Sequence, residues 1–277
     1  MIKHIMKKVI CTFFVLFIAI IMGVCGKPVP VEAGRQDGDT IYQVSLLQGL
    51  TFGDYHGNVT VKELKRHGNI GIGTFDKLNG ELIMLDGVVY RAAGDGSIEV
   101  VSNKETIPFS NVTYLDADKT KNLKNIVDYK ELCGELNKLV EERGKNRFYK
   151  IRIDGLFKEM NVRSVNAQEE PYKPLVKVLE YDQTFFDYKD IEGSIVGLYC
   201  PPYMSSLNAV GWHMHFISKD KTRGGHVLGL NIVDAKLTWD DTNAFQMLIP
   251  QNKMFTGFDL TIDQSEDIKK VETDIRK

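Results

Sequence analysis

Three of the six histidines in this chain lie close together, at positions 213, 215 and 226. The stretch 210–218 has the apolar alternation of a β-strand, in which His213 and His215 point to the same face. A turn-rich segment follows, and residues 226–233 have the pattern of a returning strand, so a hairpin sets His226 beside His215. Three imidazoles that converge without a fourth protein ligand predict a catalytic Zn²⁺ with an open coordination position.

A simpler interpretation of these histidines is that they form only local hydrogen bonds within their strands. A lone histidine would favour that interpretation. An H-x-H pattern followed by a third histidine at hairpin spacing favours a metal site instead. Such a metal can polarise a carbonyl or activate water, and the side chains around it decide which.

Three charged residues are candidates for those surroundings. Arg163 lies in a predicted strand between apolar residues, where it is either a surface group or a cleft residue that holds a carboxylate; the sequence leaves both open. Glu81 opens an apolar strand, a position that favours an exposed strand end over a site carboxylate. Glu272 lies in a charged C-terminal segment and is by default solvated.

The remaining pattern predicts an α+β fold of mainly antiparallel or mixed sheet with a few helices. Two β-rich lobes are expected: residues 40–147, with helices, and residues 148–277, with the metal site on a strand hairpin and a terminal helix. The clearest helix is predicted over residues 121–143, where apolar residues recur at roughly helical spacing before a glycine. Residues 175–179 are predicted as a strand.

The N-terminus predicts an export signal over residues 1–25, because a positively charged start precedes an apolar run from residue 9 to 24. Residues 26–39 are a predicted linker. The mature protein is therefore expected to be secreted or anchored to the outer face of the cytoplasmic membrane. The sequence before Cys25 partly matches a lipoprotein cleavage box, so a lipid anchor at Cys25 is the lesser alternative. No other membrane contact is expected.

The bulk composition indicates which classes of binding partner are expected for this chain. Thirty-five basic residues balance 37 acidic ones without a basic cluster, so no nucleic-acid partner is expected. A chain of 277 residues with 43% hydrophobic content can bury a large core. Cys133 and Cys200 are too few for a disulfide framework and are predicted to be core residues.

Several longer motifs, in the same order along the chain, resemble those of bacterial alpha-acetolactate decarboxylases. The resemblance covers about residues 41–277. Its motifs are Gly73-Thr-Phe75, Leu78-Asn-Gly-Glu-Leu-Ile-Met-Leu-Asp-Gly87, Arg163-Ser-Val165, Pro171-Tyr-Lys-Pro174, Gly211-Trp-His-Met-His-Phe-Ile-Ser218 and Gly224-Gly-His-Val-Leu228. Trp212 and Met214 depart from the usual Tyr and Leu, but neither is a ligand position.

The resemblance implies conversion of (S)-2-acetolactate, a 2-hydroxy-3-keto acid, to (R)-acetoin and CO₂, with zinc as cofactor and a homodimeric assembly. It implies three zinc ligands: His213, His215 and His226. It also implies the catalytic residues Glu81, Arg163 and Glu272, and the pocket residue Thr74. The mechanistic hypothesis for such an enzyme is that zinc chelates the ketone and hydroxyl oxygens of the substrate and stabilises the enediolate left after CO₂ departs.

Two other functions remain as alternatives. A cupin-like enzyme with a three-histidine metal also presents H-x-H on a strand, but it expects a glutamate a few residues on, and residues 216–220 supply none. An envelope zinc-binding lipoprotein would explain the signal and the histidines. It would leave Arg163 and Glu81 without a role, and such proteins commonly carry His-rich loops.

Overall fold

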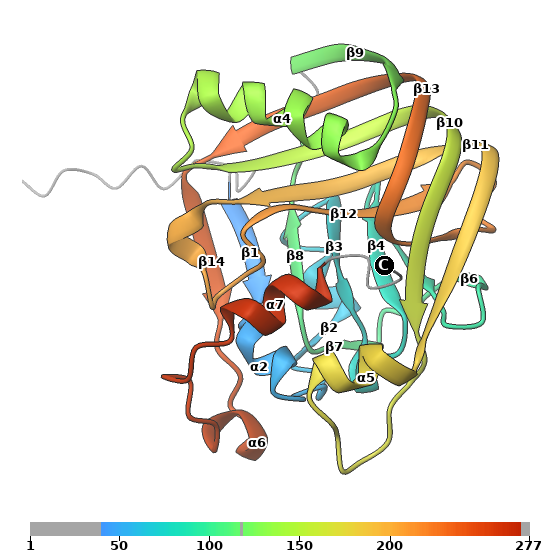
Figure 1. The fold of residues 1–277 in the computed structure, drawn as a ribbon. Coiled ribbons are helices and arrows are strands. Elements are labelled where there is room, and N and C mark those ends of the chain that lie inside the picture. Colours follow the sequence, from blue (N-terminus) through green and yellow to red (C-terminus); the bar gives the residue numbers. More distant parts are fainter. Residues whose placement is uncertain (1–39, 117–118, 273–277) are drawn as a thin grey trace, which may run out of the picture. The chain divides into compact units, whose positions relative to one another are not determined.

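The computed structural model describes residues 40–116 and 119–272. The predicted export signal, the linker and Cys25 lie outside the described residues. Within the described ranges, no helix is long and apolar enough to cross a membrane. Two large sheets dominate this part of the chain (Figure 1), in agreement with the predicted α+β class.

The first sheet has seven strands and is antiparallel except where β1 pairs with β14 in parallel. In spatial order the strands are β14 (Ala244–Leu248), β1 (Thr40–Val44), β8 (Ser110–Thr113), β3 (Ile70–Thr74), β4 (Glu81–Leu85), β5 (Val88–Ala92) and β6 (Ile98–Val100). Asp86 and Gly87 join β4 to β5 with φ of 53° and 75°, the paired positive values of a tight hairpin turn that Asp-Gly favours. All five side chains of β4 are buried, and Glu81 is the first of them. The packing of this strand therefore fixes the position of Glu81.

The second sheet has five strands, three of them long. They are β10 (Phe148–Val165), β11 (Gln183–Cys200), β12 (Gly211–Ser218), β13 (Gly224–Thr242) and β9 (Lys119–Ile126). Besides its pairing with β11, β10 also pairs with β13, so β10, β11, β12 and β13 form a closed ring of neighbours. A further short pair joins β2 (Val59–Thr60) to β7 (Thr106–Ile107).

The helices are short, except for one that packs on the second sheet. They are α2 (Leu47–Thr51), α3 (Val61–Leu64), α4 (Tyr129–Arg143), α5 (Leu175–Tyr181), α6 (Lys253–Thr256) and α7 (Ser265–Val271), with 3₁₀ turns η2 (Asp76–Leu78) and η3 (Pro202–Met204). Figure 1 shows α4 against the second sheet and α2, α5 and α7 gathered at the other side of the strands. Side chains of α2, α5 and α7 share one apolar cluster.

Two secondary-structure predictions differ from the structure, the first in where a helix begins and the second in the type of element. The helix predicted over residues 121–143 begins only at Tyr129, where the Asp128 side chain accepts a hydrogen bond from the Glu131 amide. The first part of that range belongs to β9, in which Leu123 and Ile126 are both buried although they lie three residues apart, with Asn125 at a positive φ of 55° between them. Residues 175–179, predicted as a strand, form α5 because Leu175, Val178 and Leu179 are buried on one helical face.

The two sheets exchange strands across the predicted lobe boundary between residues 147 and 148. β9 precedes that boundary but extends the second sheet, whereas β14 follows it and pairs with β1 of the first sheet. By their contacts, the described residues all fall within a single unit, Asp37–Lys277. The division into two lobes remains a prediction.

Candidate metal centre

β12 and β13 bring the three histidines together. His213 and His215 alternate along β12, and the register pairs His215 directly with His226 at the start of β13, which confirms the predicted hairpin. Gly225, just before His226, is needed here, because its φ is 147° and a Cβ would lie 2.5 Å from the Arg163 carbonyl oxygen. All three imidazoles are buried.

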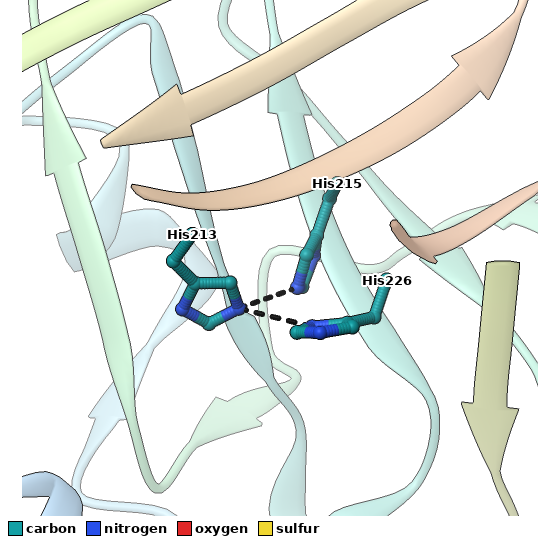
Figure 2. Close-up of side chains that lie close together, drawn as sticks. All are labelled: His213, His215 and His226. Atoms are coloured by element: carbon teal, nitrogen blue, oxygen red, sulfur yellow. Dashed lines mark hydrogen bonds between the residues drawn. The ribbon is translucent and has the colours of Figure 1, made fainter. Parts of the chain in front are cut away.

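The three rings face one another (Figure 2), and the distances between their nitrogens fit a metal ion. His213 Nε2 lies 3.2 Å from His215 Nε2 and 3.1 Å from His226 Nδ1. Two Zn–N bonds of 2.0–2.1 Å at a tetrahedral angle separate their nitrogens by roughly 3.3 Å, close to both distances.

No placement of protons on the three imidazoles satisfies every close nitrogen–nitrogen contact as a hydrogen bond. His215 Nδ1 lies 2.8 Å from the Leu82 carbonyl oxygen and donates to it, so a neutral His215 presents a lone pair at Nε2. His213 Nε2 can donate to only one of its two neighbours, so at least one nitrogen contact in the cluster is left without a suitable proton. A cation bound between the rings removes this conflict. The donor set of three buried imidazoles is one that zinc accepts.

The electrostatic surroundings keep the imidazoles neutral, the form that binds a metal. Burial and then the charge of Arg163 lower the pKa of His213 to about 3. Burial is also the main cause that lowers the pKa of His215 and of His226 well below the usual value. His213 Nδ1 is buried and has no hydrogen-bond partner among the described residues.

Two carboxylates reach this cluster from different elements. Glu81 begins β4, and its Oε2 lies 3.5 Å from His215 Nε2. Glu272 follows α7, and its Oε2 lies 3.6 Å from His213 Nε2 and 3.9 Å from His226 Nε2. Burial raises the pKa of Glu81 to about 7, opposed by Arg163 and reinforced by Glu272. Burial likewise raises the pKa of Glu272 to about 7, again opposed by Arg163.

Arg163 and Thr74 complete the inner group. Arg163 lies on β10 directly opposite His226, is only 5% exposed, and donates a hydrogen bond to the Val271 carbonyl oxygen. Of its two possible positions, surface or cleft, the structure shows the cleft. Thr74 pairs with Glu81 across β3 and β4, and its hydroxyl donates to the Gly80 carbonyl oxygen at 2.8 Å. The structure thus brings together every predicted site residue.

Comparison with known proteins identifies the family. The family model for alpha-acetolactate decarboxylase matches residues 41–262. The chain belongs to the alpha-acetolactate decarboxylase family. An alpha-acetolactate decarboxylase of Methanosarcina mazei is 38% identical over 241 residues, which cover 87% of this chain and 83% of the relative. One of Bacillus subtilis is 36% identical over 233 residues, which cover 84% and 89%.

The fold agrees with the same family. The crystal structure of alpha-acetolactate decarboxylase from Bacillus subtilis strain 168 superposes with a TM-score of 0.81 at 34% identity, covering 85% of this chain and 100% of that one. The chain is therefore an enzyme that decarboxylates acetolactate, as the sequence motifs predict. The cluster of histidines, carboxylates and Arg163 is the candidate site of that reaction.

In this decarboxylase the group lines a cavity of about 50 Å³ with largely apolar walls. The first sheet and its connections, the end of β10, α2, α5 and the end of α7 supply the walls that the sequence did not predict: Leu47, Leu50, Gly73, Leu78, Phe109, Val165, Leu175, Leu179 and Val271. We refer to α2, α5 and α7 together as the roof. Its leucines look like ordinary core residues in the sequence, so no local signal separates them from the rest of the core.

Proposed function

We propose that the chain converts (S)-2-acetolactate to (R)-acetoin and CO₂ with Zn²⁺ held by His213, His215 and His226. The observation that supports this proposal is the convergence of three neutral imidazoles, Arg163 and two carboxylates on one small cavity. When bound, a divalent zinc ion supplies Lewis acidity, which favours the build-up of negative charge on substrate oxygens. The remaining steps belong to side chains of the chain itself.

Arg163 is the proposed binding group for the substrate carboxylate. It is the arginine that lines the cavity, and it is fixed there through Val271. A guanidinium binds a carboxylate through two parallel N–H···O contacts, which orients the bond to be broken. Arg163 and a bound divalent ion would both attract a monoanionic substrate to the cavity.

Glu81 and Glu272 are the proposed groups that deliver a proton after CO₂ leaves. Their carboxyl oxygens approach the histidine cluster from β4 and from the end of α7, so they face the same point from two sides. The apolar walls limit the water beside that point. A proton that comes from a fixed donor reaches only one face of the planar intermediate, which accounts for a single enantiomer of acetoin.

The proposed function is tested by incubating the purified protein with racemic 2-acetolactate and following acetoin by chiral chromatography. We expect acetoin well above its spontaneous rate, with (R)-acetoin formed and the (S)-substrate consumed first. A folded, zinc-loaded sample that gives no acceleration would remove the proposed function. Racemic acetoin from the enzyme would instead remove the fixed proton donor, and Glu81→Gln and Glu272→Gln would show which carboxylate sets the configuration.

We also propose that the protein is exported through residues 1–25 and acts as a homodimer. The charged start and apolar run of the N-terminus support export. Mass spectrometry of the protein recovered from cells is expected to show an N-terminus after residue 23, and light scattering is expected to give twice the chain mass. An intact Met1 in the mature protein would contradict cleavage, and a monomer mass would contradict the dimer.

A further inference from the structure

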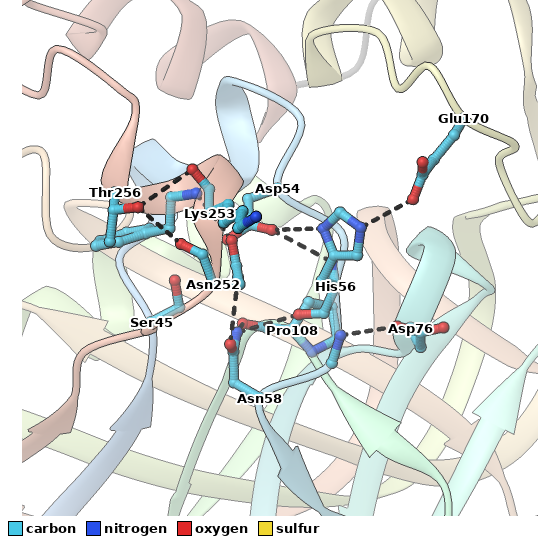
Figure 3. A network of polar contacts seen from close by, with 12 residues as sticks. Ser45, Asp54, His56, Asn58, Asp76, Pro108, Glu170, Asn252, Lys253 and Thr256 are labelled. Carbon is cyan, nitrogen blue, oxygen red and sulfur yellow. Dashed lines mark hydrogen bonds and ion pairs between the residues drawn. The ribbon is translucent and has the colours of Figure 1, made fainter.

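A second polar cluster lies beside the roof, centred on His56 (Figure 3). His56 follows α2, and its ring joins two carboxylates. Its Nδ1 lies 3.0 Å from Asp54 Oδ1, and its Nε2 lies 2.9 Å from Glu170 Oε1. The catalytic chemistry proposed above uses none of these three residues.

Asp54 anchors one side of the imidazole in the protein interior. Its side chain is 1% exposed and also accepts a hydrogen bond of 2.9 Å from Asn252 Nδ2. Asn252 in turn caps α6 by accepting from the Phe255 amide at 2.8 Å. The ring of His56 is therefore fixed from one side, and its Nε2 is presented to Glu170.

Glu170 lies in the segment 166–174, which leads from β10 to α5. At one end of this segment is the strand that holds Arg163, and at the other is the helix whose Leu175 and Leu179 line the cavity. Tyr55 supports the same junction, since its hydroxyl donates to the Lys173 carbonyl oxygen at 2.9 Å. Residues 54–56 therefore contact and stabilise the segment that lies immediately before the roof helix α5.

We propose that His56 is a positioning residue of the decarboxylase: by clamping Glu170 it holds segment 166–174, and with it α5, closed over the cavity. The inference rests on the proposed function, because it treats the cavity as the site that the substrate must enter. We infer that substrate enters by displacement of the roof, because the three histidines are buried and residues of α2, α5 and α7 line the cavity. A clamp that favours the closed arrangement raises the fraction of molecules that can hold substrate, and the apparent affinity rises with that fraction.

The charges around His56 indicate that its contact with Glu170 depends on protonation of the imidazole. Burial lowers the pKa of His56, but hydrogen bonds and charges from Glu170 and Asp54 outweigh burial, so the net shift is upward. The other groups at this junction are Tyr172, whose ring packs edge-on against His56, and Asp76, which accepts from the Gly57 amide. Because the pKa is raised in the folded state, the clamp is fully formed below the ordinary histidine pKa and weakens as pH rises through the raised value.

The test compares Glu170→Gln with Glu169→Gln in the whole protein. Both variants remove one exposed acidic charge from the same segment, but only Glu170 contacts His56. We expect Glu170→Gln to raise KM for 2-acetolactate about two- to fivefold, the size of a partly exposed ion pair, with kcat and Tm close to those of Glu169→Gln. A purely structural role would lower Tm and leave KM unchanged. His56→Gln should raise KM similarly, and the double variant should add nothing further.

Two further measurements make the outcome decisive. The KM ratio of Glu170→Gln to the wild type is expected to be larger at about pH 6 than at about pH 9, because loss of the His56 proton as pH rises weakens its ion pair with Glu170. Amide hydrogen exchange in residues 175–181 should be faster in Glu170→Gln than in Glu169→Gln, a readout that needs no activity. Equal KM and equal exchange in the two variants would overturn the clamp. If the wild type shows no decarboxylase activity, the proposed function is overturned. The hydrogen-exchange comparison of the two variants then tests by itself whether His56 holds segment 166–174.

Discussion

Treatment of the purified protein with a chelator is expected to abolish acetoin formation, and Zn²⁺ is expected to restore it. The histidine cluster is the reason: the structure supplies three neutral nitrogen ligands there and no proton arrangement that satisfies all of them. A bound metal contributes several kcal/mol of transition-state stabilisation, and each 1.36 kcal/mol is tenfold in rate, so the loss should be at least about a thousandfold. Acetoin formation before and after metal readdition measures it.

The same experiment has a structural readout. Because the metal binds only the folded chain, chelation should lower Tm, and metal readdition should raise it again. His226→Ala should lose both activity and the zinc-dependent Tm shift. Mg²⁺ should not restore activity, since three imidazoles suit zinc better than a hard oxygen-seeking cation. Full activity in a chelator-treated sample shown to be metal-free would refute the metal assignment.

Replacement of Arg163 by alanine is expected to lower kcat/KM by at least about a hundredfold. Arg163 is the cavity's guanidinium, it is almost fully buried, and it lies opposite His226 on the neighbouring strand. Removal of one preorganised charged donor from an enclosed site typically costs a hundredfold to a thousandfold. Steady-state kinetics with 2-acetolactate measure the effect, and urea unfolding shows whether the variant is folded.

A matched control comes from the same strand. Arg152 also lies on β10, but its partners are Asp154 and Asp86, outside the cavity. Arg152→Ala removes the same side chain and the same charge, so it should keep activity within about threefold of the wild type, as expected for a partly exposed ion pair. A rise in KM alone in Arg163→Ala would show that Arg163 only binds the carboxylate, whereas a fall in kcat would show that it also stabilises developing charge. Wild-type kinetics in Arg163→Ala would remove it from the reaction.

The metal centre was predictable because its geometry is local. Alternation along one strand places His213 and His215 on one face, and a short turn returns the chain so that His226 lies opposite His215. These relations depend on backbone geometry over about fourteen residues, and that geometry can be predicted from the spacing of the residues in the sequence. Arg163 was open to two interpretations, and Glu81 and Glu272 were expected at the site only through the family resemblance.

The local pattern misled where burial is decided by distant partners. Leu123 and Ile126 have helical spacing, yet they lie in β9, because pairing with β13 satisfies the backbone and buries both side chains against the second sheet. Leu175 to Leu179 looks apolar enough for a strand, yet it forms α5, because contacts with α2 and α7 bury only one face. In both cases a short apolar run is compatible with either structure, and the tertiary surroundings choose.

The sequence by itself determined the α+β class, the histidine hairpin and the motifs that identify the family. Each depends on residues that are close in the chain, where φ, ψ and side-chain direction follow from spacing. Only the tertiary structure decided that Glu272 reaches His213, that Arg163 points into the cavity, and that α2, α5 and α7 close over it. Those contacts join residues far apart in the sequence, and their formation depends on how the sheets pack, which no local pattern encodes.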